Sequence, residues 1–158
     1  MDVFEYAVKA EIESEKIYRD LVEKSNDKGI KAVFTLLADM EKEHIRIFSE
    51  LKNGNLVTVT SEKYFQKLEA VLKHIRTKNE NIKEDTSHLD IYQIALSAEI
   101  EASEFYQLKA EETDDPQLKA ALRSIAAEER RHSMALDELI EFLSLDDIYI
   151  EDGDWSSM

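Results

Sequence analysis

The sequence predicts an all-α protein, an antiparallel four-helix bundle with one long crossover between its second and third helices. Three observations favour this fold. The 158 residues include only three glycines and one proline, so little interrupts a helix. Four long segments repeat apolar side chains at the spacing of an amphipathic helix. Two of the three links between these segments are short, and short links join antiparallel neighbours.

The first helix is predicted at residues 2–25 and the second at residues 28–53. Their inner stripes are Phe4, Val8, Glu11, Glu15, Tyr18 and Val22, then Ile30, Phe34, Leu37, Glu41, His44, Phe48 and Leu51. Asp27 is a suitable N-cap for the second helix, and Gly54 is a suitable stop just beyond its end. The short link at residues 25–27 therefore closes a hairpin.

The third helix is predicted at residues 89–112. The fourth begins at Asp115 and Pro116, an N-cap followed by proline in the first turn. Their inner stripes are Tyr92, Leu96, Glu99, Ala102 and Tyr106, then Leu118, Leu122, Ile125, Glu129, His132, Leu136, Leu139 and Leu143. The short link at residues 113–115 closes a second hairpin.

One domain of 158 residues is expected. Its parts are hairpins at about 2–53 and 88–144, a crossover at 54–87 and an acidic tail at 145–158. Within the crossover, residues 62–77 are predicted to be helical behind a capping Ser61, and residues 79–87 to form a polar loop. A bundle helix of about 24 residues is roughly 36 Å long, which this crossover can span. No fold is predicted for the tail.

Composition excludes several classes of protein. The formal net charge of −15 repels phosphate backbones and anionic lipids, so neither nucleic acid nor a membrane surface is an expected partner. The chain has no cysteine, which excludes disulfides, thiolate zinc sites and iron–sulfur clusters. No signal peptide opens the sequence, and no apolar run approaches the roughly 20 residues of a membrane span. A cytoplasmic location is the default expectation.

The second hairpin repeats the first. Ala10-Glu11-Ile12-Glu13 recurs as Ala98-Glu99-Ile100-Glu101, and further matches pair Tyr18 with Tyr106, Ala38 with Ala126, Glu41 with Glu129, His44 with His132, and Leu51 with Leu139. All these pairs differ by 88 in residue number, without a gap. A repeated hairpin suggests a pseudo-two-fold bundle, which would place two equivalent metals side by side.

Four glutamates and two histidines are the candidate metal ligands. They are Glu11, Glu41, His44, Glu99, Glu129 and His132, and all lie on the inner stripes. Burying four ionised carboxylates without compensation would cost several kcal/mol each. No lysine or arginine lies beside them on these stripes, whereas two divalent cations would balance four glutamates. One glutamate from each of two helices, with Glu-x-x-His from each of the others, is the ligand pattern of di-iron and di-manganese bundles. Iron and manganese suit such ligands, and zinc stays open.

The remaining polar and apolar candidates have simpler interpretations. Tyr18 and Tyr106 are expected to be core aromatics, and a further role, in which their hydroxyls reach the ligands, stays open. Glu15 is expected to be peripheral because its counterpart in the repeat is Ser103. The expected solvated glutamates are Glu13, Glu43, Glu101 and Glu128; the expected core methionines are Met40 and Met134; the expected surface histidines are His74 and His88.

At the candidate ligands, the sequence resembles proteins of the rubrerythrin-type branch of the ferritin-like superfamily. The resemblance covers about residues 2–53 and 88–144. It rests on Glu-x₆-Tyr in both hairpins and on LADMEKEH (37–44) and IAAEERRH (125–132). It implies a ferritin-like bundle with two iron ions that react with hydrogen peroxide or dioxygen. Terminal ligands would be Glu11 and Glu99, bridging ligands Glu41 and Glu129, and His44 and His132 would each hold one iron.

Two departures from the family pattern shape the expected function. Rubrerythrins carry a rubredoxin domain with four cysteines, and this chain has none, so the resemblance implies an external, rubredoxin-like electron donor. Rubrerythrins also carry a further glutamate where this sequence has Ala102. The six ligands that remain are closer to the set shared by bacterioferritins.

Two functions stay open at this point. The first is a di-iron oxidoreductase of rubrerythrin type, which the resemblance implies to be a homodimer. The second is non-enzymatic, either iron binding and storage or a metal-stabilised interaction protein. The acidic composition and the absence of a built-in electron-transfer module favour the second.

Overall fold

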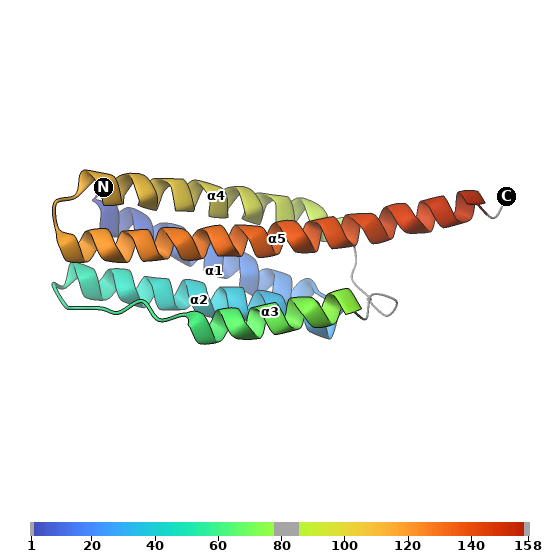
Figure 1. Cartoon of the computed structure of the whole chain (residues 1–158), viewed down its shortest axis with the longest axis horizontal. Helices are drawn as coiled ribbons and strands as arrows, with labels where there is room; N and C mark the ends of the chain where they lie inside the picture. The colour runs from blue at the N-terminus through green and yellow to red at the C-terminus, as the bar shows by residue number, and fades with distance from the viewer. Residues whose placement is uncertain (1, 78–85, 157–158) are drawn as a thin grey trace.

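A computed structural model describes residues 2–77 and 86–156, and the regular structure within these ranges is helical. Its elements are α1 (Val3–Lys24), α2 (Lys28–Lys52), α3 (Glu62–Thr77), the short 3₁₀ helix η2 (Thr86–His88), α4 (Leu89–Glu112) and α5 (Pro116–Ser156). The most extensive packing joins α1 to α2 and α4 to α5. The predicted all-α bundle of two antiparallel hairpins is therefore confirmed (Figure 1).

The crossover helix α3 lies alongside α2 on the outside of the bundle (Figure 1). Of the predicted polar loop, residues 79–85 lie outside the described residues, and Thr86–His88 forms a 3₁₀ turn instead of a loop. The helix α5 runs on to Ser156. Its last turns extend past the other helices (Figure 1), so the backbone of the acidic tail continues the helix.

The helix ends follow the predicted capping residues. The Asp27 carboxylate accepts a hydrogen bond of 3.1 Å from the backbone N–H of Ile30. The Asp115 carboxylate accepts one of 3.0 Å from Gln117, immediately after the proline that opens α5. Gly54 has φ +79°, a left-handed conformation that glycine adopts without strain. These local signals explain why sequence and structure agree on where α2 and α5 begin and where α2 ends.

The apolar core consists of two clusters with the candidate ligands between them. On α1, Glu11 lies between Ala7 of one cluster and Tyr18 of the other. The same alternation holds on the remaining three bundle helices. The first cluster includes Phe34, Leu37, Tyr92, Leu136 and Leu139, and the second includes Ile47, Phe48, Tyr106, Leu122 and Ile125. The bundle thus holds a polar layer closed by apolar side chains at both ends.

Two of the minor predictions were wrong. Met134 is 65% exposed, because it lies two residues after the buried His132 and so about 200° around the helix from it. His88 is half-buried instead of lying on the surface, because it belongs to the turn that leads into α4. Among the described residues, no helix is both long and apolar enough to cross a membrane.

Candidate metal centre

All four bundle helices contribute to one buried polar layer. Each of α1 and α4 provides one glutamate, and each of α2 and α5 provides a glutamate and a histidine three residues apart, which places the pair on one helical face. The six residues are 0–2% exposed: Glu11, Glu41, His44, Glu99, Glu129 and His132. The structure therefore brings together all the candidate ligands that the sequence predicts.

Within this layer the side chains form two overlapping groups. The first group is Glu11, Glu41, His44 and Glu129, and the second is Glu41, Glu99, Glu129 and His132. In each group, one atom per residue lies within 4.8 Å of the corresponding atoms of the others. Glu41 and Glu129 belong to both groups, so two metal ions could share these two carboxylates.

The two imidazoles take equivalent positions. In His44, Nδ1 lies 2.7 Å from Oε1 of Glu129 and 3.4 Å from Oε2 of Glu11. In His132, Nδ1 lies 2.9 Å from Oε1 of Glu41 and 3.6 Å from Oε1 of Glu99. The rings are stacked, with centroids 5.9 Å apart. Each histidine therefore turns its Nδ1 atom towards the carboxylates.

Several buried polar atoms of this layer have no hydrogen-bond partner among the described residues. They are Oε2 of Glu11, Glu41 and Glu99, Oε1 of Glu129 and Nδ1 of His44; the last two atoms lie 2.7 Å apart but without the geometry of a hydrogen bond. Lysine and arginine form no ion pair with the six residues in the described part of the chain. Unpaired buried carboxylate oxygens are costly. Since carboxylate oxygens and imidazole nitrogens are metal ligands, this arrangement fits divalent cations.

Without metal, the carboxylates perturb one another. Burial, then the charges of Glu11 and Glu129, raise the pKa of Glu41 well above 4.5. Burial and the charge of Glu129 also raise the pKa of Glu11. Burial lowers the pKa of His44, but Glu11 and Glu129 outweigh it and hold that pKa well above 6.5. The metal-free layer therefore retains protons that a bound cation would displace.

Glu129 shows the opposite shift. Its burial raises the pKa, but the charge of His44 and the hydrogen bond with His132 outweigh burial, so the pKa of Glu129 lies below its ordinary value of 4.5. One glutamate of the layer is thus ionised while its neighbour Glu41 favours the protonated form.

Two tyrosines cross between the hairpins to the ligands. The Tyr18 hydroxyl donates a hydrogen bond of 2.5 Å to Oε1 of Glu99, and the Tyr106 hydroxyl donates one of 2.9 Å to Oε1 of Glu11. Burial and the nearby carboxylates raise the pKa of both phenols, which therefore stay protonated. Both tyrosines are therefore core aromatics, as predicted, and their hydroxyls also contact the candidate ligands.

Sequence reasoning missed Glu128. It was expected to be solvated, yet it is only 8% exposed, and its Oε1 lies 2.9 Å from Nε2 of His44. Burial raises the pKa of Glu128, but the hydrogen bond and charge of His44 lower it by more than burial raises it. The pKa of Glu128 therefore lies below 4.5. A signal was available, because the repeat aligns Glu128 with Met40, which was correctly expected in the core.

The other secondary predictions mostly held. Glu13 and Glu101 are exposed, and Glu43 is half-buried and pairs with Arg46. Glu15 is also half-buried, at the periphery of the layer, where it pairs with Arg19. None of them joins the two groups of candidate ligands.

The crossover helix covers part of the layer from outside. Phe65 of α3 is 2% exposed, and its ring centroid lies 5.6 Å from that of His132. The guanidinium of Arg131 lies over the outer face of the same ring, 3.7 Å from its centroid. An aromatic side chain and a cation–π contact therefore separate His132 from solvent.

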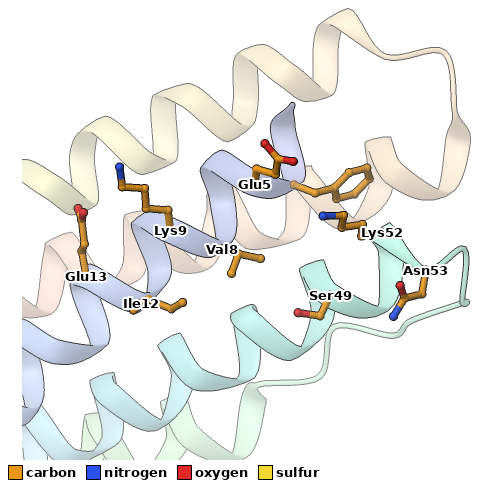
Figure 2. Close-up of a pocket in the computed structure, with 9 residues that line it drawn as sticks. Glu5, Val8, Lys9, Ile12, Glu13, Ser49, Lys52 and Asn53 are labelled. Carbon is orange, nitrogen blue, oxygen red and sulfur yellow. The ribbon is translucent and has the colours of Figure 1, made fainter. Parts of the chain in front are cut away.

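A surface groove of about 630 Å³ lies away from this layer. Figure 2 shows Val8, Lys9 and Ile12 on α1, Ser49 and Lys52 on α2, and Asn53 just after α2, lining it. None of the six candidate ligands lines the groove. The groove therefore does not reach the candidate ligands of the buried layer.

The comparisons with known proteins agree with this geometry. The family model for rubrerythrin matches residues 2–145. No curated protein and no solved structure matches the chain significantly. The family match covers both hairpins and the crossover, and so nearly the whole chain. The chain belongs to the rubrerythrin family.

Proposed function

We propose that this protein is a di-iron oxidoreductase that reduces hydrogen peroxide or dioxygen with electrons from an external, rubredoxin-like donor. The observation that carries the proposal is the pair of overlapping, fully buried carboxylate and histidine groups. Membership of the rubrerythrin family supports iron as the metal. Two ferrous ions bound there would supply two electrons, which with two protons reduce one hydrogen peroxide to two waters. One dioxygen needs four electrons and four protons to reach water, so the external donor would supply the other two electrons.

The positions of the side chains suggest a role for each. Glu41 and Glu129 belong to both groups and would bridge the two ions. Glu11 and His44 would complete one position, and Glu99 and His132 would complete the other. The phenols of Tyr18 and Tyr106 hold the terminal glutamates in place by hydrogen bonds. Carboxylates fixed in this way are pre-organised for the metals.

The burial of the layer restricts the substrate and the donor. Because the six residues are at most 2% exposed, only a molecule as small as peroxide or dioxygen fits the proposal. The sequence has no cysteine, so this chain itself contains no thiolate-bound iron that could pass electrons to the centre. The proposed electron donor therefore lies outside these 158 residues.

Anaerobic reconstitution with Fe²⁺, followed by stopped-flow mixing with peroxide, tests the proposal. We expect two irons per chain and a rapid absorbance change matched by loss of peroxide. Glu41→Gln should impair both metal positions, whereas Glu11→Gln should impair one, because only Glu41 belongs to both groups. Absence of both absorbance change and peroxide consumption in the iron-loaded protein would exclude the activity.

Iron binding or storage without catalysis is the second candidate. The net charge of −15 and Ala102 in place of the further glutamate of rubrerythrins favour it. Size-exclusion chromatography with light scattering separates the two candidates. A homodimer is expected for the oxidoreductase, and a very large hollow assembly that retains many irons per chain would favour storage.

A further inference from the structure

The two halves of the repeat match at the candidate ligands but differ behind the histidines. Glu128 and Met40 occupy equivalent positions, 88 residues apart. Oε1 of Glu128 lies 2.9 Å from Nε2 of His44. At the equivalent place, Sδ of Met40 lies 3.3 Å from Nε2 of His132. Both contacts are buried.

These two partners differ in charge and in strength as acceptors. A carboxylate accepts a strong, charge-assisted hydrogen bond, whereas a thioether is a weak and neutral acceptor. An acceptor on the outer ring nitrogen fixes the tautomer and makes the inner nitrogen a better metal ligand. Glu128 therefore orients the His44 ring and makes its inner nitrogen more basic. Met40 has a much weaker effect of the same kind on His132.

The crossover helix adds to the difference. The repeat contains no counterpart of α3, which packs mainly on α2 and also touches α5. Its Phe65 ring lies against His132. The outer surroundings of His132 are thus a thioether and an aromatic ring, while those of His44 include an anion.

We propose that the two metal positions are inequivalent, and that the position formed by Glu11 and His44 binds a divalent cation more tightly and fills first. The inference rests on the proposed metal centre but goes beyond it. The ligands alone predict two equal positions, since each offers one terminal glutamate, one histidine and the shared pair. The hydrogen bond from His44 to Glu128 makes Glu128 a positioning residue for one metal only.

Anaerobic titration of the metal-free protein with Co²⁺ tests the inference. Absorbance and calorimetry together give the number of ions bound and the affinity of each step. We expect two ions per chain in two steps whose affinities differ by about 10- to 100-fold, the usual effect of such an outer partner. Anomalous scattering from crystals grown with one equivalent of Co²⁺ should place that ion beside Glu11 and His44.

Variants identify the cause of the difference. Glu128→Gln keeps the shape but removes the anion, and it should weaken the tighter step by about 10- to 100-fold while sparing the other. Met40→Gln places an amide acceptor behind His132. It should strengthen the weaker step and so reduce the difference in affinity between the two steps. Glu101→Gln removes one exposed charge and is the matched control, which should leave both steps unchanged.

Each outcome decides the inference. Two equal steps in the unmodified protein, or two unequal steps that both Glu128→Gln and Met40→Gln leave unchanged, would overturn the inequivalence and leave the metal centre intact. Binding of fewer than two ions by the unmodified protein would overturn the metal centre as well. If the two steps have unequal affinities and these variants make the affinities more nearly equal, Glu128 is supported as the residue that makes one position tighter.

Discussion

The phenol groups of Tyr18 and Tyr106 tie the two hairpins together through the candidate ligands. Each tyrosine donates a hydrogen bond to a candidate ligand of the opposite hairpin, Glu99 or Glu11, so the contacts join residues 81 and 95 positions apart. Hydrogen bonds from buried donors to charged acceptors contribute more than ordinary ones, about 1.5–3 kcal/mol. The tyrosines therefore stabilise the bundle and orient the glutamates through the same contacts.

Replacement of one hydroxyl should measure this contribution. Tyr18→Phe removes the donor to Glu99 and should lower the free energy of unfolding by about 2 kcal/mol in urea titration. Tyr6→Phe is the control, because Tyr6 is 42% exposed and should lose almost nothing. Equal effects from the two substitutions would mean that the buried hydrogen bond adds no stability.

At the scale of the elements, α3 combines a linking and a packing role. Phe65, Leu68 and Ile75 of α3 are 2–4% exposed, so the crossover helix contributes to the core. Gly29, in the first turn of α2, allows a close approach, because an added Cβ would lie 3.0 Å from Cγ1 of Ile75. The crossover helix α3 is thus a fifth helix packed against α2 and α5.

Removal of the Phe65 ring should test the packing of α3. Phe65→Ala leaves a cavity between α3 and α5 and should destabilise the protein by about 3 to 5 kcal/mol, as for other buried aromatics. Leu56→Ala, at a position 76% exposed, should change the unfolding midpoint very little. A loss below about 1 kcal/mol for Phe65→Ala would show that α3 is only loosely docked.

Much of this architecture could be predicted because its signals are local. Helical periodicity and the capping residues Asp27 and Asp115 fix the elements, and the inner stripes select the six polar residues. Glu128 was missed because its helical position lies off the inner stripe, although the repeat aligns it with the core residue Met40; its contact with His44 is seen in the structure alone. The continuation of α5 to Ser156 was not predicted, since the tail contains Gly153 and several aspartates, residue types that favour turns over helix interiors.

For the whole molecule, the central feature is a charged layer closed inside an apolar bundle. The pKa of Glu41 and the pKa of His44 are both raised in the folded, metal-free state. A raised folded pKa gives stability that is complete below the unfolded pKa and is lost as the pH rises through the folded value. Glu129, whose pKa is lowered, has the opposite effect: the stability that it adds is complete above about pH 4.5 and is lost only as the pH falls through its lower folded pKa.

The stability of the metal-free protein should therefore fall as the pH rises. The decline begins above pH 4.5, the ordinary pKa of Glu41, and His44 adds to it above pH 6.5. Each proton that the folded state retains adds up to about 1.4 kcal/mol per pH unit to this slope. Urea unfolding in EDTA from pH 5 to pH 9 measures it, with Glu41→Gln expected to flatten the curve. Saturating Mn²⁺ should remove the decline, whereas metal-free stability that rises with pH would contradict the electrostatics.

Anomalous scattering from crystals grown with saturating Fe²⁺ under anaerobic conditions tests the central claim most directly. Two iron peaks should lie inside the bundle, one beside Glu11 and His44 and one beside Glu99 and His132, with Glu41 and Glu129 between them. An interior without iron, or iron confined to the acidic surface, would contradict the account.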